Sequence, residues 1–266
     1  GAVLTIAAAG SEMSNSSVIT NEEGGLKRGC NTDLCRCRFA VMNPELTYTL
    51  PDYQTQCGCT DIMMHTMERY FNMSEDMELT DGISEALIKT VMKHSKILKE
   101  HPDCYESRAE VMWASSLSHN GLTGCGTDGG DWACHQLEHE IGGMFDVAHG
   151  AGLAAVWGSW ARYVYKARQE RFAKFARNIF DIQETDDEKA AVAGIEAMES
   201  YYRSVGMPTS LCELGIHATE EQIKEMADKC SFYGKRTVGV MKKIGAPEAA
   251  EIYRMANDKS IPLYSR

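Results

Sequence analysis

Hydrophobic positions divide the chain into a strand-like start and a longer helical part. Short apolar and β-branched runs at residues 3–6, 17–20 and 38–42 alternate with Gly, Asn and Glu turns, a pattern typical of strands. After Pro51, apolar residues recur at spacings of three and four, which predicts helices. We expect these helices around residues 62–63, 83–97, 111–117, 132–145, 153–165, 188–205, 220–230 and 247–257.

Composition and charge narrow the class of protein. With 266 residues, 44% of them hydrophobic, the chain can bury one large core or two smaller ones. It has no apolar run of about 18 residues, which argues against a membrane span, and no signal peptide is visible. A formal net charge of -11 argues against nucleic acid as the main partner, because phosphate backbones require clustered Lys and Arg.

One carboxylate and several histidines suggest a divalent metal site. Asp61 and His65 are four residues apart, so on a helix they share one face, and His135 and His139 repeat this spacing. His149 follows a Gly-Gly break and precedes another glycine-rich turn, which suggests that the chain brings a new element back to the same point. Each pair alone is more often a solvated or capping pair, and it is the combination that predicts a metal.

The ten cysteines are expected to be free thiols. Cys30, Cys35, Cys37, Cys57 and Cys59 fall within 30 residues, which also suggests a zinc cluster. Their spacings do not form two Cys-x-x-Cys pairs, however. In a reducing cytoplasm, which we expect for this chain, small buried thiols are the ordinary state.

The histidines lie within longer and more specific motifs. These motifs are DWACHQLEHE at residues 131–140 and FDVAHGAGL at residues 145–153, with further matching stretches at 43–51, 61–68 and 211–216. Together they resemble the iron-containing alcohol dehydrogenases, in particular their butanol dehydrogenase branch, over nearly the whole chain. The resemblance implies a dehydroquinate synthase-like architecture, in which a mainly α metal-binding domain follows an α/β nucleotide-binding domain.

The resemblance implies a role for each candidate residue. Asp61, His65, His135 and His149 are implied to hold the catalytic metal, and His139 matches a family histidine near the substrate that is not a ligand. The implied cofactor-binding residues are Thr5, Gly10, Ser11, Glu12 and Lys27.

The implied cofactor segment departs from the family pattern. The family usually has proline and threonine where this chain has Ala7 and Ala9, so one hydroxyl contact to the cofactor is missing or replaced. Lys27 matches a lysine near the ribose, although a solvated turn lysine is an equally good interpretation.

The start of the chain is also unlike the family. Its members begin with a domain that carries a glycine-rich phosphate loop, and no glycine group here follows a strand in that arrangement. We therefore expect residues 1–50 to be a remnant of that nucleotide-binding domain and residues 51–266 to be the all-helical metal-binding catalytic domain. As a fragment, the isolated chain is expected to lack useful activity.

The implied reaction is hydride transfer between NAD(H) or NADP(H) and a short primary alcohol or aldehyde. A divalent metal acts as the Lewis acid, with Fe2+ favoured and Zn2+ second. His139 would relay a proton if its pKa is near neutral, or would only orient its neighbours. Trp132, three residues before His135 on the same helical face, is a candidate wall of the substrate pocket. Family analogy also implies a homodimer.

Two alternatives stay open. A metal-dependent hydrolase would use the same ion to activate water, and it needs a carboxylate base. Glu138 is a poor candidate for that base, because we expect it to point to another helical face from His135 and His139. The chain could also be a stable metal-binding module without activity.

Overall fold

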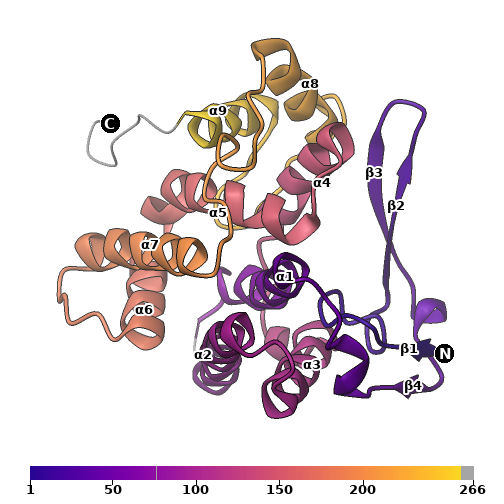
Figure 1. Cartoon of the computed structure of the whole chain (residues 1–266). Helices are drawn as coiled ribbons and strands as arrows, with labels where there is room; N and C mark the ends of the chain where they lie inside the picture. The colour runs from indigo at the N-terminus through magenta and orange to yellow at the C-terminus, as the bar shows by residue number, and fades with distance from the viewer. Residues whose placement is uncertain (76, 259–266) are drawn as a thin grey trace.

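The computed structural model describes residues 1–75 and 77–258, and this part of the chain is mainly helical (Figure 1). The first 50 residues hold the strands and short 3-10 helices β1 Ala2–Val3, β2 Ser16–Asn21, β3 Leu26–Asn31, η1 Asp33–Cys35, β4 Ala40–Val41 and η2 Pro44–Thr47. The helices that follow are α1 Asp52–Tyr70, α2 Glu78–Glu100, α3 Tyr105–His119, η3 Leu122–Gly124, α4 Ala133–Phe145, α5 His149–Val164, η4 Tyr165–Ala167, α6 Gln169–Phe180, α7 Asp187–Ser204, α8 Glu220–Cys230 and α9 Ala246–Asn257.

The predicted mainly helical fold is confirmed, and every predicted helical range overlaps an observed helix. The pattern did not predict α6, although Phe172, Phe175 and Ile179 have helical spacing and are buried. Charged residues lie between these apolar positions, so the helical spacing is not evident in the sequence. Strand β3 was also not predicted, because its basic and glycine residues lack the apolar alternation of a typical strand.

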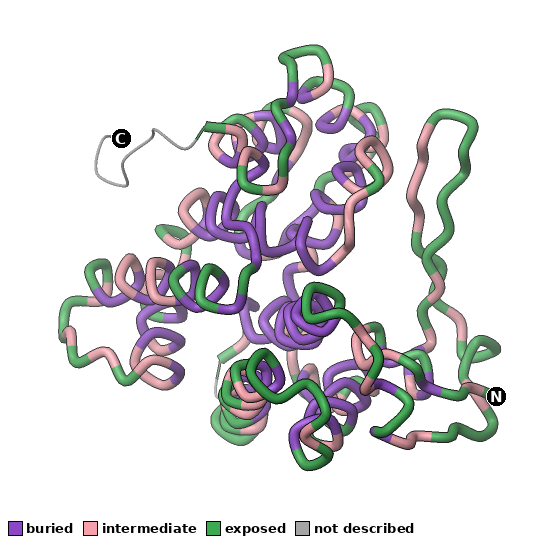
Figure 2. Tube along the Cα trace, in the orientation of Figure 1, coloured by how far each residue is buried: buried purple, intermediate pink, exposed green. Residues whose placement is uncertain are grey.

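The described strands form two small sheets. β1 and β4 pair in parallel. β2 and β3 form an antiparallel hairpin in which Ser16 lies opposite Asn31, and its turn includes Gly24 and Gly25 at positive φ. In Figure 1 this hairpin stands beside α4, and most of its residues are exposed or half-buried (Figure 2).

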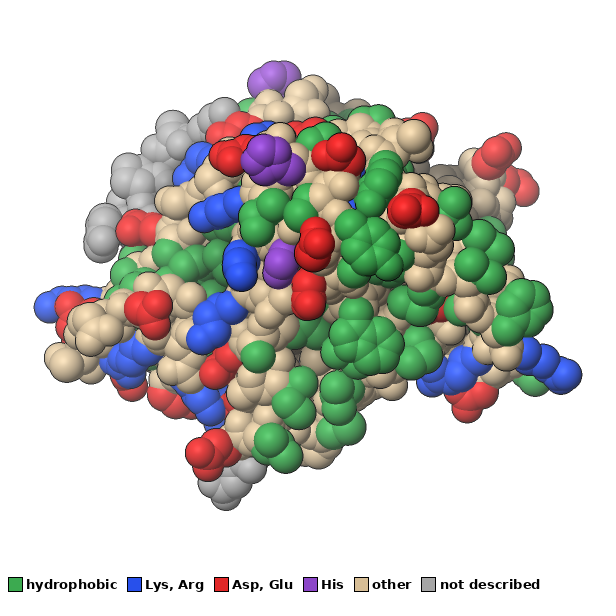
Figure 3. Space-filling view, turned by 60° about the horizontal axis from the view of Figure 1, so that its bottom comes forward, with side chains coloured by type: hydrophobic (Ala, Val, Ile, Leu, Met, Phe, Trp, Pro, Cys, Tyr) green, Lys and Arg blue, Asp and Glu red, His purple; other side chains and the backbone are tan. Residues whose placement is uncertain are grey.

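The N-terminal part leaves large hydrophobic side chains in solvent. Leu34, Ile19 and Phe39 are exposed by 94%, 70% and 66%. Figure 3 shows a face of the molecule on which hydrophobic side chains gather among charged ones. Large hydrophobic side chains that are this exposed are typical of regions that contact another domain or chain.

Helix α1 is the centre of the helical part (Figure 1). It packs against α2, α3 and α5, and most of its residues are buried (Figure 2). Met63 and Met64 are 0% and 1% exposed, and Trp157 and Trp160 of α5 are buried to the same extent. Among the described residues, no helix has the length and apolar character needed to cross a bilayer.

A glycine lets α1 and α5 approach each other. A Cβ atom placed on Gly150 would overlap the backbone carbonyl of Cys57 in α1. Only glycine permits backbones to come this close. The contact brings His149, the first residue of α5, to the part of α1 that carries Asp61.

Replacing Gly150 by Ala should therefore separate the two helices. We expect Gly150→Ala to lower the free energy of unfolding by about 1–3 kcal/mol, as for other overpacked sites. The control is Gly82→Ala in α2, where an added Cβ meets no atom within 4 Å. It should leave the free energy unchanged or raise it by about 0.5–1 kcal/mol. Urea denaturation measures both, and equal midpoints for the two variants would contradict the prediction.

Candidate metal centre

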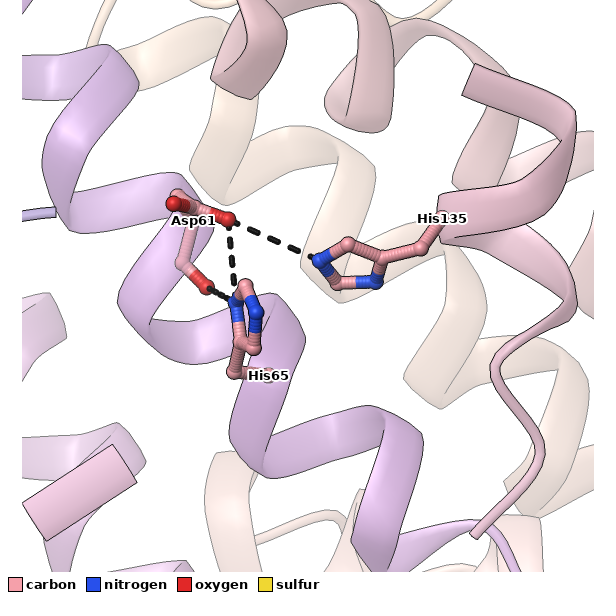
Figure 4. Close-up of side chains that lie close together, drawn as sticks. All are labelled: Asp61, His65 and His135. Carbon is pink, nitrogen blue, oxygen red and sulfur yellow. Dashed lines mark hydrogen bonds and ion pairs between the residues drawn. The ribbon is translucent and has the colours of Figure 1, made fainter. Parts of the chain in front are cut away.

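Helix α1 presents acidic and imidazole side chains on one face. Asp61, His65 and Glu68 follow one another at spacings of four and three residues, so they lie above one another on the helix. His65 Nδ1 lies 3.0 Å from both the backbone oxygen and the Oδ1 atom of Asp61 (Figure 4). The Asp61 side chain is only 5% exposed. The carboxylate therefore lies inside the protein with an imidazole beside it.

Two further histidines reach the same oxygen from other helices. His135 in α4 and His149 in α5 each place Nε2 3.6 Å from Asp61 Oδ1. The turn between these helices includes Asp146, whose φ of 51° is left-handed, and it reverses the chain as the glycine-rich sequence suggested. The four side chains predicted as metal ligands are thus brought together around one carboxylate oxygen.

Two buried glutamates contact the far sides of two of these rings, one glutamate for each ring. Glu68 Oε1 lies 3.1 Å from His135 Nδ1, and Glu138 Oε2 makes a short contact with His149 Nδ1. An ionised carboxylate only accepts hydrogen bonds, so each Nδ1 carries a hydrogen and each Nε2 is the atom available to a cation. No sequence motif marked Glu68 as part of the site, although its helical spacing from Asp61 would have revealed it.

The predicted orientation of Glu138 is wrong. Because it follows His135 by three residues, it lies on the same side of α4 and not on another face. Its carboxylate is fully buried and contacts both His149 and Lys27 Nζ, the latter at 3.2 Å. Burial opposes its ionisation, but His149 and Lys27 hold the pKa of Glu138 below its usual value.

The charges of the site favour a cation. Burial opposes ionisation of Asp61, yet the surrounding imidazoles, His65 foremost, hold the pKa of its carboxyl well below the usual range. Burial lowers the pKa of His65 to about 4. In His135, burial is outweighed by the carboxylates of Asp61 and Glu68, which raise the pKa to about 9. A proton on His135 thus occupies the place that a metal ion could take.

Two buried atoms at this point have no hydrogen-bond partner among the described residues. They are Asp61 Oδ1 and His135 Nε2, which face each other. Leaving both unpaired is costly, and a cation bound between them would satisfy both. A carboxylate oxygen with imidazole nitrogens suits Fe(II), Zn(II), Ni(II) or Mn(II). The residues present therefore fit a divalent metal ion.

His139 lies beside this site in a second group of potential ligands. Glu138, His139 and His149 place ligand atoms within 4.8 Å of one another. Burial lowers the pKa of His139 to about 3, so the near-neutral pKa on which a proton relay depends is not met. The ring is a neutral imidazole at physiological pH, which still offers one N–H donor.

Two aromatic rings lie against His65. The Trp132 ring is 5.7 Å from that of His65 and 5.4 Å from that of His135, so it lies near the histidines as expected. Its φ of 61° places it before α4, however, and not on the helix. The His119 ring, which no sequence motif marked, lies 3.8 Å from that of His65. Burial, with His65 nearby, holds the pKa of His119 well below its usual value.

Four of the residues predicted for the cofactor lie in one loop. Gly10 is buried with a φ of 54°, and Glu12 is buried with Oε1 accepting a hydrogen bond of 2.5 Å from Ser116 in α3. Thr5 and Ser11 are exposed. The loop therefore has both a buried anchor and side chains that face solvent.

This loop lies next to the metal-site helix, whereas Lys27 lies elsewhere. A Cβ on Gly58 of α1 would overlap the carbonyl oxygen of Ala7, so the loop backbone rests on α1 one turn before Asp61. Lys27 belongs to β3, and its Nζ contacts Glu138. The lysine thus reaches the metal site through a glutamate of α4.

All ten cysteines are free thiols, as predicted. The expected burial applies to only some of them. Within the described residues, no cysteine belongs to a group that could hold a metal, so the zinc-cluster interpretation has no support. The buried thiols are Cys57, Cys59, Cys134 and Cys230, and the exposed ones are Cys30, Cys35 and Cys125.

Comparisons with known proteins agree with this geometry. The model of the C-terminal part of the Fe-containing alcohol dehydrogenase family matches residues 55–256. NADH-dependent butanol dehydrogenase A of Clostridium acetobutylicum is 37% identical over 95% of this chain and 64% of that protein. NADPH-dependent aldehyde reductase YqhD of Escherichia coli is 32% identical over 96% of this chain and 65% of its own length.

A solved structure shares the fold. The crystal structure of NADH-dependent butanol dehydrogenase A from Thermotoga maritima superposes with a TM-score of 0.91 and is 35% identical, covering 96% of this chain and 65% of that one. The chain thus spans just under two thirds of the length of these relatives.

The convergence on Asp61 predicts one metal ion per chain. We expect anaerobic titration with Fe(II) or Zn(II) to give a stoichiometry near one, and His149→Ala to weaken binding by at least about a hundredfold, because one of four donors is lost. His94→Ala is the control, since His94 bonds Ser107 Oγ away from these residues. Equal affinities in the two variants would show that His149 does not bind the ion.

The glutamate behind His135 gives a second prediction. Glu68→Gln keeps the shape of the side chain but removes the charge that orients the Nδ1–H donor. We expect metal affinity to fall by roughly 10–100-fold. Competition with a chromophoric chelator measures this loss, and an unchanged affinity would mean that Glu68 has only a packing role.

Proposed function

The chain belongs to the Fe-containing alcohol dehydrogenase family, and on that basis we propose that it forms the metal-binding part of an NAD(P)-dependent enzyme that interconverts short primary alcohols and aldehydes. The observation that carries the proposal is the convergence of Asp61, His135 and His149 on one point. Because the chain spans under two thirds of its relatives, the activity of the whole protein is part of the proposal.

The proposed metal ligands are Asp61, His65, His135 and His149. The name of the family supports iron as the ion, and the donor set accepts zinc as the second choice. When bound, the ion supplies a Lewis acid that polarises the oxygen of the substrate. Glu68 and Glu138 fix the tautomers of two ligands, so that both Nε2 atoms are directed to the same point before the ion arrives.

We propose that His139 acts as a neutral hydrogen-bond donor and not as an imidazolium acid. Its low pKa keeps the ring neutral, so one N–H can hold the oxygen of an alcohol or aldehyde, and the second nitrogen can accept a hydrogen bond. Trp132 would exclude water beside His65 and His135, which strengthens the local electrostatics.

For the cofactor, we propose that the loop with Thr5, Gly10, Ser11 and Glu12 lies along the nicotinamide of NAD(H) or NADP(H). Support comes from the position of the loop on α1, one turn before Asp61. Similar proteins are described as NADH-dependent in one case and NADPH-dependent in another, so either dinucleotide is compatible. Lys27 is proposed to face the ribose while its ammonium also neutralises Glu138.

We also propose that the chain contains parts of two domains. Residues 1–50 would complete a nucleotide-binding domain, and residues 51–266 would form the catalytic helical domain. The exposed hydrophobic side chains of the first part support this division, since another domain or a second copy in a homodimer would cover them. The free thiols support a cytoplasmic location.

The hydrolase alternative is not favoured. Such an enzyme needs a carboxylate base with room for a water molecule. Glu138 is the acid nearest His149, but its oxygens already contact His149 and Lys27. The similar proteins named above are dehydrogenases or reductases.

The gene product that contains these 266 residues tests the proposal. With Fe(II) or Zn(II), NADH or NADPH and butyraldehyde, we expect loss of the reduced-nicotinamide absorbance that a chelator abolishes. His149→Ala should lower kcat/KM by at least about a hundredfold, because the Lewis acid is lost, whereas His94→Ala should not. Ester or amide cleavage without aldehyde reduction would instead establish the hydrolase.

A further inference from the structure

His119 is the last residue of α3, and its ring packs closely against that of a proposed metal ligand. Its ring centroid is 3.8 Å from that of His65, with a tilt of 40° between the two planes. The residue is 8% exposed. The His119 ring is therefore held close to the His65 imidazole, away from solvent.

Hydrogen bonds fix the His119 ring in one orientation. Its Nδ1 lies 3.0 Å from the carbonyl oxygen of Ser115 and 2.7 Å from Ser118 Oγ. A carbonyl only accepts, so Nδ1 carries the hydrogen and Nε2 is bare. That Nε2 is buried and has no hydrogen-bond partner among the described residues. In this orientation the His119 ring contacts His65 while its Nε2 atom makes no hydrogen bond to the described residues.

His119 also contacts the proposed cofactor loop. A Cβ on Gly10 would overlap the Cβ and Cγ atoms of His119, so the loop backbone touches the ring directly. The same helical turns hold the loop twice more. Ser115 Oγ donates to the carbonyl of Ala8 at 3.1 Å, and Ser116 Oγ donates to Glu12 Oε1.

We propose that His119 is a positioning residue that holds the His65 ring for metal binding and links this ligand to the loop at residues 8–12. The inference rests on the metal site of the proposed function. An imidazole that binds a cation becomes more positive, and the π face of a neighbouring neutral ring stabilises it. Because the loop backbone contacts the same ring, a displacement of the loop moves His119 and then His65.

Coupling of this kind is reciprocal. If filling the metal site fixes His65 and His119, it also fixes the backbone at Gly10, and an ordered loop in turn favours metal binding. A histidine that merely fills the core would affect the stability of the fold and leave the coordination of the metal unchanged. The experiment must therefore observe the coordination itself.

Co(II) bound to this chain provides that observation, because its visible d–d bands report ligand geometry. We expect His119→Ala to weaken Co(II) binding by about tenfold and to shift these bands. His119→Phe restores a ring face and should recover most of the affinity. The control is His94→Ala. It removes a histidine of α2 that hydrogen-bonds to Ser107 of α3, the helix that carries His119, and it should bind Co(II) as the unaltered chain does.

A second variant changes the loop that contacts His119 and leaves every proposed metal ligand unaltered. Gly10→Ala places a methyl group against the ring, so it should shift the Co(II) bands in the same direction as His119→Ala. Gly82→Ala, whose methyl group enters open space, is the control. If His119→Ala does not fold, His119→Phe and Gly10→Ala still decide the question.

The outcomes separate this inference from the proposed function. If the unaltered chain binds one Co(II) and the variants at residues 10 and 119 give the same affinity and spectrum, the positioning role is overturned and the metal site stands. If neither the unaltered chain nor His94→Ala binds Co(II), both the metal site and the role of His119 fail.

Discussion

A single buried carboxylate, that of Asp61, determines how this part of the chain is arranged. An ionised carboxylate inside a protein is very unfavourable unless charges or hydrogen bonds compensate it. Here the compensation comes from three imidazoles on α1, α4 and α5, so the three helices must meet at one point. The glycine contact between α1 and α5 and the left-handed residue that precedes α5 are both needed for that meeting.

The sequence predicted most of the helices and the candidate ligands because both follow from short-range spacing. Asp61 and His65 are neighbours on any helix, and the glycine breaks before His149 indicated a reversal of the chain. The motifs then suggested which histidines belong together. These inferences need no knowledge of which helices pack against each other.

The features of the site that the sequence did not predict depend on contacts between residues far apart in the chain. The contact of His119 with His65 joins the end of α3 to the middle of α1, and no periodicity relates the two positions. The low pKa of His139 follows from burial, which spacing alone does not give. Trp132 was placed on a helix because its distance from His135 is helical, whereas its backbone adopts a left-handed turn.

Close glycine contacts around α1 also limit how the protein can be redesigned. At Gly58, Gly130 and Gly150, an added Cβ would overlap backbone atoms of a neighbouring segment, so α1 has no room to shift on these sides. A library aimed at new substrates would lose most members if it varied these positions. Trp132 is half-buried beside the histidines, and its side chain can be varied without moving the helices, provided that the replacement tolerates the left-handed backbone at this position.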